Sequence, residues 1–181
     1  MKNLYIVCFC FLAVCLTNAQ ERYLTKSGEI TFFSESPLEN IAAKNSQVLS
    51  IVDAGKKQMA ISILMKSFMF EKALMQEHFN ENYVESDKYP KATFRGAILN
   101  FDTITDKETK VEVKGKLTIH GITKEMVIKA LAVKKDNAIV MQGDFFITLS
   151  DFNVDIPSVV EKNIAKEIKV SFNFNHQPFK K

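Results

Sequence analysis

Alternation of hydrophobic and polar residues is the dominant pattern along this chain. In residues 110–119, Val111, Val113, Leu117 and Ile119 occupy one face, while lysines, a glutamate and a threonine occupy the other. A period of two residues is that of a strand with one buried and one solvated face. The same pattern predicts seven further strands, at residues 23–33, 48–52, 58–64, 92–99, 122–133, 138–149 and 168–175.

One stretch, residues 70–83, departs from this alternation. Phe70, Leu74, His78 and Phe79 recur there at the spacing of one helical face, with acidic and basic residues between them. A proline seven residues later ends the connection, because it cannot continue a helix and it favours an extended backbone in the residue before it. The sequence therefore predicts one short helix that crosses between two strands.

Three glycines interrupt the apolar rows of the predicted strands. Gly96, Gly115 and Gly143 each stand two residues away from an apolar residue on either side, so all three belong to an inward row. A glycine weakens a strand, and its recurrence indicates either sharp coiling at a barrel corner or a place where a ligand approaches the backbone. Closure of a barrel would by itself require sharp coiling of this kind.

These elements together predict an all-β fold: an eight-stranded antiparallel β-barrel with one short helical crossover. The interior of a barrel this size is just wide enough to fill with side chains or to hold one slim ligand. Because the inward rows are apolar, a ligand inside would have to be apolar over most of its length.

The first nineteen residues have the pattern of an export signal. Lys2 supplies the positive start, residues 4–16 form an apolar run, and small or polar residues 17–19 precede Gln20. The apolar run is too short to span a bilayer. We expect cleavage to leave residues 20–181 as a single domain in the periplasm or outside the cell, with no transmembrane segment in the mature chain.

All three cysteines, Cys8, Cys10 and Cys15, lie within this signal. The mature chain would therefore lack a thiol for catalysis, metal binding or a disulfide. A lipoprotein that begins with an acylated Cys15 is the alternative, although Val14 stands where such signals have a small residue.

Charge argues against nucleic acid as a partner. Of the 181 residues, 46% are hydrophobic and 25% are charged, which is typical of a globular domain. Because Lys2 is lost with the signal, 23 basic and 21 acidic side chains remain, a net charge of only +2.

Three blocks of sequence resemble the YceI-like family of exported bacterial proteins. They are LMQEHF at 74–79, YVESDKYPKATF at 83–94 and GKLTIHGITK at 115–124, and the third is the most specific. Their order and spacing also match, and the resemblance extends from about Gly28 to Phe174. It implies a lipocalin-like barrel that holds a long isoprenoid or similar amphiphilic chain, such as a polyprenyl lipid or a quinone, in an apolar tunnel.

One segment departs from the family pattern. Residues 32–41, FFSESPLENI, stand where the family usually has a Lys-His-Leu-like segment soon after the first strand. The departure leaves open both the contact to a polar headgroup there and the identity of the ligand.

The candidate site combines an apolar lining with a few polar residues at the rim. His78, His120 and Lys124 are the candidate headgroup contacts. Each has a simpler alternative interpretation. His78 could be a partly buried histidine of the helix. His120 could belong to a hairpin turn in which Gly121 takes a positive φ, and Lys124 could be a solvated strand residue. The candidate lining could equally form a filled core, as most inward phenylalanines do; it consists of Phe68, Phe70, Leu74, Phe79, Phe94, Ile98, Leu117, Ile119, Phe145, Phe172 and Phe174.

Neither metal binding nor catalysis finds a matching motif. His78 and Glu81 could supply two metal ligands from one helical face, but the sequence offers no third. A Gly-x-Ser-x-Gly elbow is absent, and Ser150 with Asp151 and Asp155 matches ordinary turn chemistry. We expect no catalytic residue, no metal and no cofactor other than a bound isoprenoid lipid or quinone.

The sequence thus predicts an exported lipid-binding protein and not an enzyme, with an apolar or amphiphilic lipid as its partner. One alternative is a structural or interaction module whose core is filled by its own phenylalanines. A weaker alternative is an enzyme that acts on lipid. The oligomeric state is left open, with a homodimer as one option.

Overall fold

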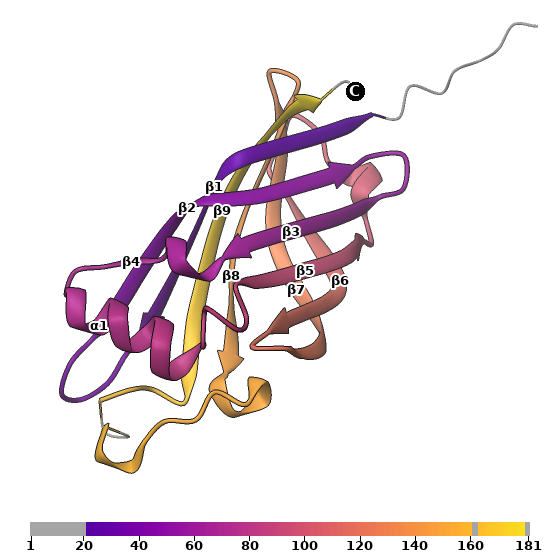
Figure 1. Ribbon diagram of the computed structural model, residues 1–181. Coiled ribbons are helices and arrows are strands. Elements are labelled where there is room, and N and C mark those ends of the chain that lie inside the picture. Colours follow the sequence, from indigo (N-terminus) through magenta and orange to yellow (C-terminus); the bar gives the residue numbers. More distant parts are fainter. Residues whose placement is uncertain (1–20, 161–162, 180–181) are drawn as a thin grey trace, which may run out of the picture.

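Strands dominate the computed structural model, which describes residues 21–160 and 163–179 (Figure 1). Within these residues, eight long antiparallel strands pair in the order β1-β9-β8-β7-β6-β5-β3-β2, and β1 also pairs with β2, so the sheet closes on itself. The predicted eight-stranded antiparallel β-barrel is confirmed. The strands are β1 (Arg22–Ser34), β2 (Ile41–Asp53), β3 (Gln58–Leu64), β5 (Lys91–Ile98), β6 (Thr109–Ile119), β7 (Ile122–Lys135), β8 (Ala138–Thr148) and β9 (Glu167–Phe179).

The crossover between β3 and β5 contains the helix α1 (Ala73–His78), which continues into a wider helical turn, η2 (Phe79–Tyr83). The predicted short helical crossover is confirmed, but it begins three residues later than expected. The reason is that Phe70 pairs with Ala43 of β2 as part of a two-residue strand, β4 (Met69–Phe70). The other short helical turns of the described chain are η1 (Met65–Ser67), η3 (Phe101–Thr103), η4 (Leu149–Phe152) and η5 (Ser158–Val160).

Strand boundaries follow the prediction closely except at the start of β2 and at the end of β9, which extends four residues beyond the predicted 175 to Phe179. Strand β3 covers the predicted residues 58–64, whereas β2 begins at Ile41 instead of Val48. The first half of β2 carries a polar residue at an inward position. Asn45 is fully buried, and its side-chain amide donates a hydrogen bond of 2.9 Å to the carbonyl oxygen of Leu64. That bond makes burial of the amide tolerable, but the polar residue breaks the alternation from which a strand is predicted.

The inward glycines are places of close packing. Gly96 and Gly115 face each other across β5 and β6, under the ring of Phe94. A methyl group on Gly115 would lie 2.4 Å from a backbone oxygen of β5 and 2.7 Å from that ring. Gly143 has the same setting, 3.0 Å from the ring of Phe172. These positions therefore fit the barrel-corner interpretation, in which a ring covers a glycine, and not open space for a ligand.

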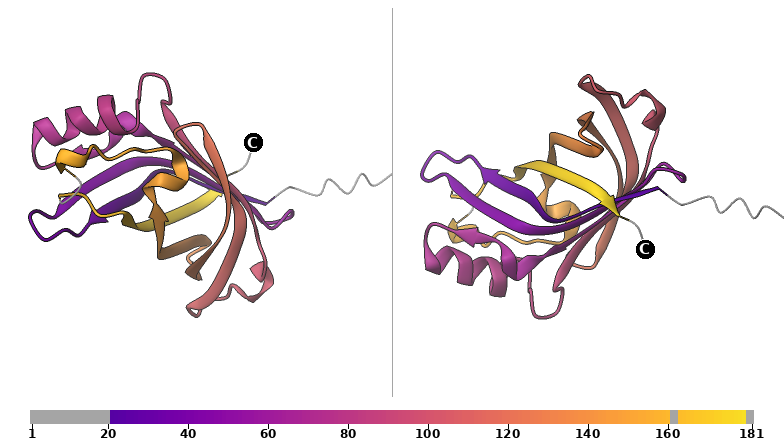
Figure 2. Two further views of the ribbon diagram at one scale, coloured as in Figure 1. Left: turned by 90° about the horizontal axis from the view of Figure 1, so that it is seen from below. Right: turned by 90° about the horizontal axis from the view of Figure 1, so that it is seen from above.

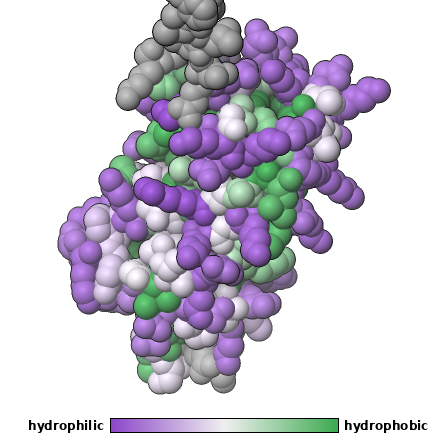
Figure 3. Space-filling view, turned by 90° about the vertical axis from the view of Figure 1, so that its right-hand side faces the viewer, coloured by the Kyte–Doolittle hydropathy of each residue, from purple (hydrophilic) through white to green (hydrophobic). Residues whose placement is uncertain are grey.

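The two ends of the barrel differ. Where β1 begins and β9 ends, side chains fill the interior, and Val48, Val52 and Met141 have no exposed surface. At the opposite end, the α1–η2 crossover and residues 149–160 lie side by side (Figures 1 and 2). The outside is mostly hydrophilic on the face that Figure 3 shows, as expected from the lysine-rich outward rows.

The predicted export signal, residues 1–19, and its three cysteines lie outside the described residues. Within residues 21–160 and 163–179, no helix combines the length and hydrophobicity needed to cross a bilayer.

Candidate functional site

A cavity of about 460 Å³ lies at the end of the barrel that the crossover and residues 149–160 flank. Its deeper wall consists of buried aliphatic side chains from four different strands, including Ile30, Ile63, Leu117 and Val170. The elements that flank this end supply the rest of the wall. Because strands and crossover contribute side chains to the same space, the site exists only once the barrel has closed.

Most of the predicted lining lies on the wall of this cavity. The residues that the structure places there are Phe68, Phe70, Leu74, Phe79, Leu117, Ile119 and Phe145. Phe94, Ile98, Phe172 and Phe174 are not among the described residues that line it; they pack in or against the core farther along the barrel. The two-residue period places all of these strand side chains inward, but it carries no information about depth along the barrel axis.

Four phenylalanine rings form one side of the wall. Phe32 comes from β1, Phe68 and Phe70 from the segment after η1, and Phe79 from η2. Ring centroids are 5.3 Å apart for Phe32 and Phe68, 5.4 Å for Phe32 and Phe79, and 5.1 Å for Phe70 and Phe79. At such distances the rings stabilise one another beyond the area they bury, so the crossover is held against the barrel by aromatic contacts.

Sequence reasoning missed part of the wall. Phe32 belongs to the segment that departs from the family pattern, although it alternates correctly with Ile30 and could have been found by that signal. Leu149, Val154 and Val160 also line the cavity, from a segment of short helical turns without any regular period. Nothing in the local sequence there indicates which side chains face inward.

Two charged residues on the cavity wall, Glu39 and Lys72, are partly exposed to solvent. Glu39, from the β1–β2 connection, forms an ion pair with Lys72, which immediately precedes α1. The hydrogen bond from Lys72 to Glu39 raises the pKa of that lysine. The pair therefore joins two elements of the mouth, and it places one charge of each sign beside the entrance.

His78 and Leu74 lie at the same opening. Both line the cavity and both are exposed, Leu74 with 61% of its surface. The alternative interpretation of His78 as a partly buried histidine is therefore wrong. The helical period is right about the shared face, but that face is turned toward an opening in the barrel and not toward closed core.

His120 lies away from the cavity and has a structural role. It occupies the β6–β7 turn with φ +50°, and Gly121 follows with φ +77°, as expected for that hairpin. Its Nε2 is 2.6 Å from the carboxylate of Glu85, and its Nδ1 is 3.2 Å from the carbonyl oxygen of Phe152. The histidine thus connects η4, which carries the wall residue Leu149, with the segment after the crossover.

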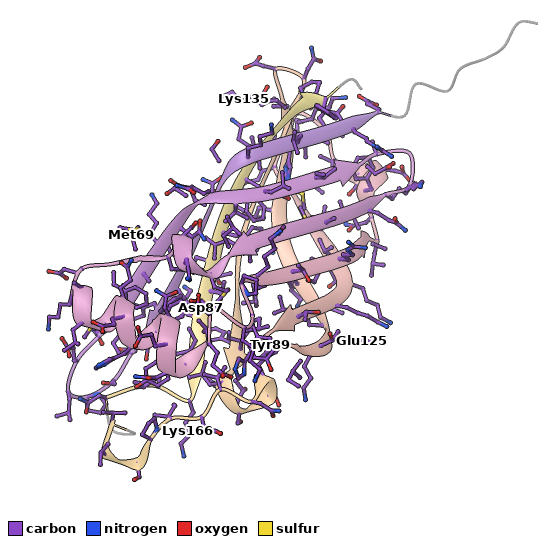
Figure 4. The ribbon with its side chains drawn as sticks, viewed as in Figure 1. Met69, Asp87, Tyr89, Glu125, Lys135 and Lys166 are labelled. Atoms are coloured by element: carbon purple, nitrogen blue, oxygen red, sulfur yellow. The ribbon has the colours of Figure 1, made fainter. Side chains whose placement is uncertain are left out.

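The surroundings of His120 support this connection. The ring of Tyr89, labelled in Figure 4, contacts the imidazole edge-on with centroids 4.5 Å apart. The hydrogen bond from His120 lowers the pKa of the Glu85 carboxyl group. Lys124 is exposed, with its Nζ 3.6 Å from Asp151 of η4, so the structure places neither His120 nor Lys124 on the cavity wall.

Among residues 21–160 and 163–179, no group of three or more histidine, cysteine, aspartate and glutamate side chains is placed to hold a metal. A serine and a histidine do meet, Ser50 and His176, but both are completely buried and neither lines the cavity. A hydroxyl buried in this way has no surface that a substrate in the cavity could reach.

Comparison with known proteins assigns the sequence to a family. The model of the YceI-like domain matches residues 21–176. A comparison with curated proteins gave no match.

Solved structures share the fold at low identity. A polyisoprenoid-binding domain from Saccharophagus degradans, implicated in plant cell wall breakdown, has a TM-score of 0.77 at 13% identity, covering 88% of this chain and 99% of that one. BcnA of Burkholderia cenocepacia has a TM-score of 0.68 at 20% identity, covering 81% and 94%. A YceI protein of Campylobacter jejuni has a TM-score of 0.57 at 18% identity, covering 81% and 90%.

Proposed function

Because this chain belongs to the YceI-like domain family, we propose that it binds one apolar or amphiphilic lipid chain in the barrel cavity, as a binding protein and not as an enzyme. The observation that carries the proposal is a cavity of about 460 Å³ whose deep wall is aliphatic and aromatic, with charged side chains at the opening. Such a site favours a ligand that is apolar along most of its length and polar at one end.

The chemistry of binding follows from this division. Burial of hydrocarbon contributes about 25 cal/mol per Å² of apolar surface removed from water. A polar headgroup would lose its hydration inside, so it stays at the mouth beside Glu39, Lys72 and His78. The Saccharophagus domain is described as polyisoprenoid-binding, which supports an isoprenoid or a comparable chain as the ligand here.

We also propose that the protein works outside the cytoplasm, in the periplasm or as a secreted protein. The support is the pattern of residues 1–19, a positive start followed by an apolar run and small or polar residues. An exported carrier would meet lipid at membrane surfaces or in the extracellular medium. The mature chain would begin at Gln20.

The decisive experiment combines ligand recovery with one wall substitution. Protein purified without detergent is extracted with organic solvent, and the extract is analysed by mass spectrometry for a hydrophobic chain. Leu117→Trp then places an indole in the cavity, because Leu117 lines it and is only 4% exposed. We expect loss of the lipid from a variant that still folds, since a cavity accepts added volume that a packed core would answer with strain of about 1–3 kcal/mol.

The matched control is Val127→Trp, an outward position on β7 that is 49% exposed. It adds the same side chain to the barrel without entering the cavity, and it should retain the lipid. If no lipid is recovered, if added isoprenoid and quinone fail to bind, and if Leu117→Trp merely loses stability, the filled-core module replaces the carrier.

A further inference from the structure

Three inward phenylalanine side chains pack in or against the core beyond the described lining of the cavity. Along β9 the inward positions run from Val170 on the cavity wall to Phe172 and then Phe174, which lie progressively deeper. The rings of Phe172 and Phe174 stack with centroids 5.3 Å apart and planes 26° from parallel. Phe94 enters from β5, where it is the cross-strand partner of the wall residue Leu117. We call these three rings the aromatic floor.

Glycines make room for the floor. A methyl group on Gly115 would lie 2.7 Å from the ring of Phe94, one on Gly143 would lie 3.0 Å from the ring of Phe172, and one on Gly28 would lie 2.6 Å from the ring of Phe174. Real side chains do not approach so closely, so each ring rests directly on backbone. Because backbone lies directly behind them, these rings have no room to move outward.

The interior beyond the floor is already occupied. Phe94 and Phe174 are 3% and 1% exposed, and Met141, the cross-strand partner of Phe174, is not exposed at all. A chain that continued past the floor would have to displace fully buried side chains in a close-packed region. The cavity is therefore a blind pocket in this direction and not a tunnel through the barrel.

We infer that the aromatic floor limits the ligand to a single chain with about fifteen buried carbons, such as three isoprene units or a medium-length acyl chain. The inference rests on the proposed function and specifies its ligand class. A water-sized group, which is also about the size of a methylene, occupies about 30 Å³, so 460 Å³ accommodates about fifteen such groups. Longer chains bind with their remaining carbons outside the mouth.

A homologous series of ligands tests this limit. Saturated fatty acids of ten to twenty-two carbons compete with an environment-sensitive apolar dye, anilinonaphthalene sulfonate, for delipidated protein. We expect the dissociation constant to fall about fourfold per added methylene up to a break near fifteen carbons, and to change little beyond it. A steady fall through twenty-two carbons would overturn the limit while leaving lipid binding intact. If neither the fatty acids nor isoprenoid alcohols bind, the proposed function fails as well.

Phe172→Ala tests whether the floor sets the limit. Phe172 is half-buried, so its removal disturbs folding less than removal of Phe94 or Phe174. We expect the break to move to chains about four carbons longer, because a vacated ring site collapses only partly. Phe172→Leu removes less volume and should move the break by a smaller amount, which keeps the test available if the alanine variant does not fold.

The control is Phe146→Ala on β8, which removes the same ring from an outward position that is 59% exposed. In this variant the dissociation constants of the fatty-acid series should still level off near fifteen carbons. If Phe172→Ala folds and its dissociation constants level off at the same chain length as in the unmodified protein, the aromatic floor does not set the length of the buried chain.

Discussion

His176 Nε2 lies 2.8 Å from the hydroxyl oxygen of Ser50, and neither side chain has any exposed surface. The other ring nitrogen, Nδ1, lies 3.0 Å from the carbonyl oxygen of Ile139. Since a carbonyl oxygen can only accept, Nδ1 carries the proton, and Nε2 of the neutral imidazole accepts from the Ser50 hydroxyl. The histidine therefore joins β2, β8 and β9 inside the barrel, and it does so in its uncharged form.

This arrangement makes stability depend on pH. Burial lowers the pKa of His176 to about 4, against 6.5 for an unperturbed histidine. Between these pH values the unfolded chain binds a proton at this histidine that the folded chain does not bind. The contribution of neutral His176 to the free energy of unfolding is therefore fully present above about pH 6.5 and is lost as the pH drops toward 4. We expect the free energy of unfolding, measured with urea, to be about 2 kcal/mol lower at pH 5 than at pH 7.5.

The matched variants for this prediction are His176→Met and His78→Gln. The first removes the buried titrating group and should flatten the profile between pH 5 and 7.5, at a lower overall stability. The second removes an exposed histidine and should leave the profile unchanged. An unaltered pH slope in folded His176→Met would assign the effect to other groups.

A second prediction concerns the close packing at Gly115. Gly115→Val should lower the free energy of unfolding by at least about 2 kcal/mol, because even its first side-chain carbon would lie 2.4 Å from the carbonyl oxygen of Arg95. Lys116→Val changes the next residue, whose side chain is exposed and contacts Glu125 at 3.7 Å. Because exposed ion pairs contribute little and valine favours strands, that variant should be nearly neutral. Equal melting temperatures would refute the packing argument.

A third prediction tests the connection made by His120. His120 is only 12% exposed, and His120→Ala removes its contacts with the carboxylate of Glu85 and with the carbonyl oxygen of Phe152. We expect a loss of about 1–3 kcal/mol, measured by denaturant unfolding. Lys124→Ala removes a more exposed contact with the neighbouring Asp151 and should cost less than about 1 kcal/mol. Similar losses for the two variants would show that His120 is no more than a surface residue of the turn.

A fourth prediction concerns processing. Intact-mass measurement of exported protein should give a chain that begins at Gln20, and a reducing agent should leave its melting temperature unchanged, because the cysteines are removed with residues 1–19. A mass that corresponds to a lipid-modified chain starting at Cys15 would instead place the domain on a membrane surface.

The sequence by itself determined the strands and the crossover, because a strand's alternation is a local property. Each half-buried strand needs apolar residues at every second position, and residues 58–64 and 110–119 satisfy this wherever their partners lie. The pattern fails where a buried polar side chain has its hydrogen-bond partner far away in the sequence. Asn45 is fully buried, and its side-chain amide donates a hydrogen bond to the carbonyl oxygen of Leu64. No residue near Asn45 in the sequence indicates that contact.

Only the tertiary structure decided which inward residues form the cavity wall and which form its floor. Phe145 and Phe172 occupy equivalent positions in the alternation, yet one lines the cavity and the other packs on Gly143. Depth along the barrel depends on the register between strands, including the shifts between β1 and β2 near Gly28. Register is set by pairings between residues far apart in the chain, so a local period can assign the face of a side chain but not its depth in the barrel.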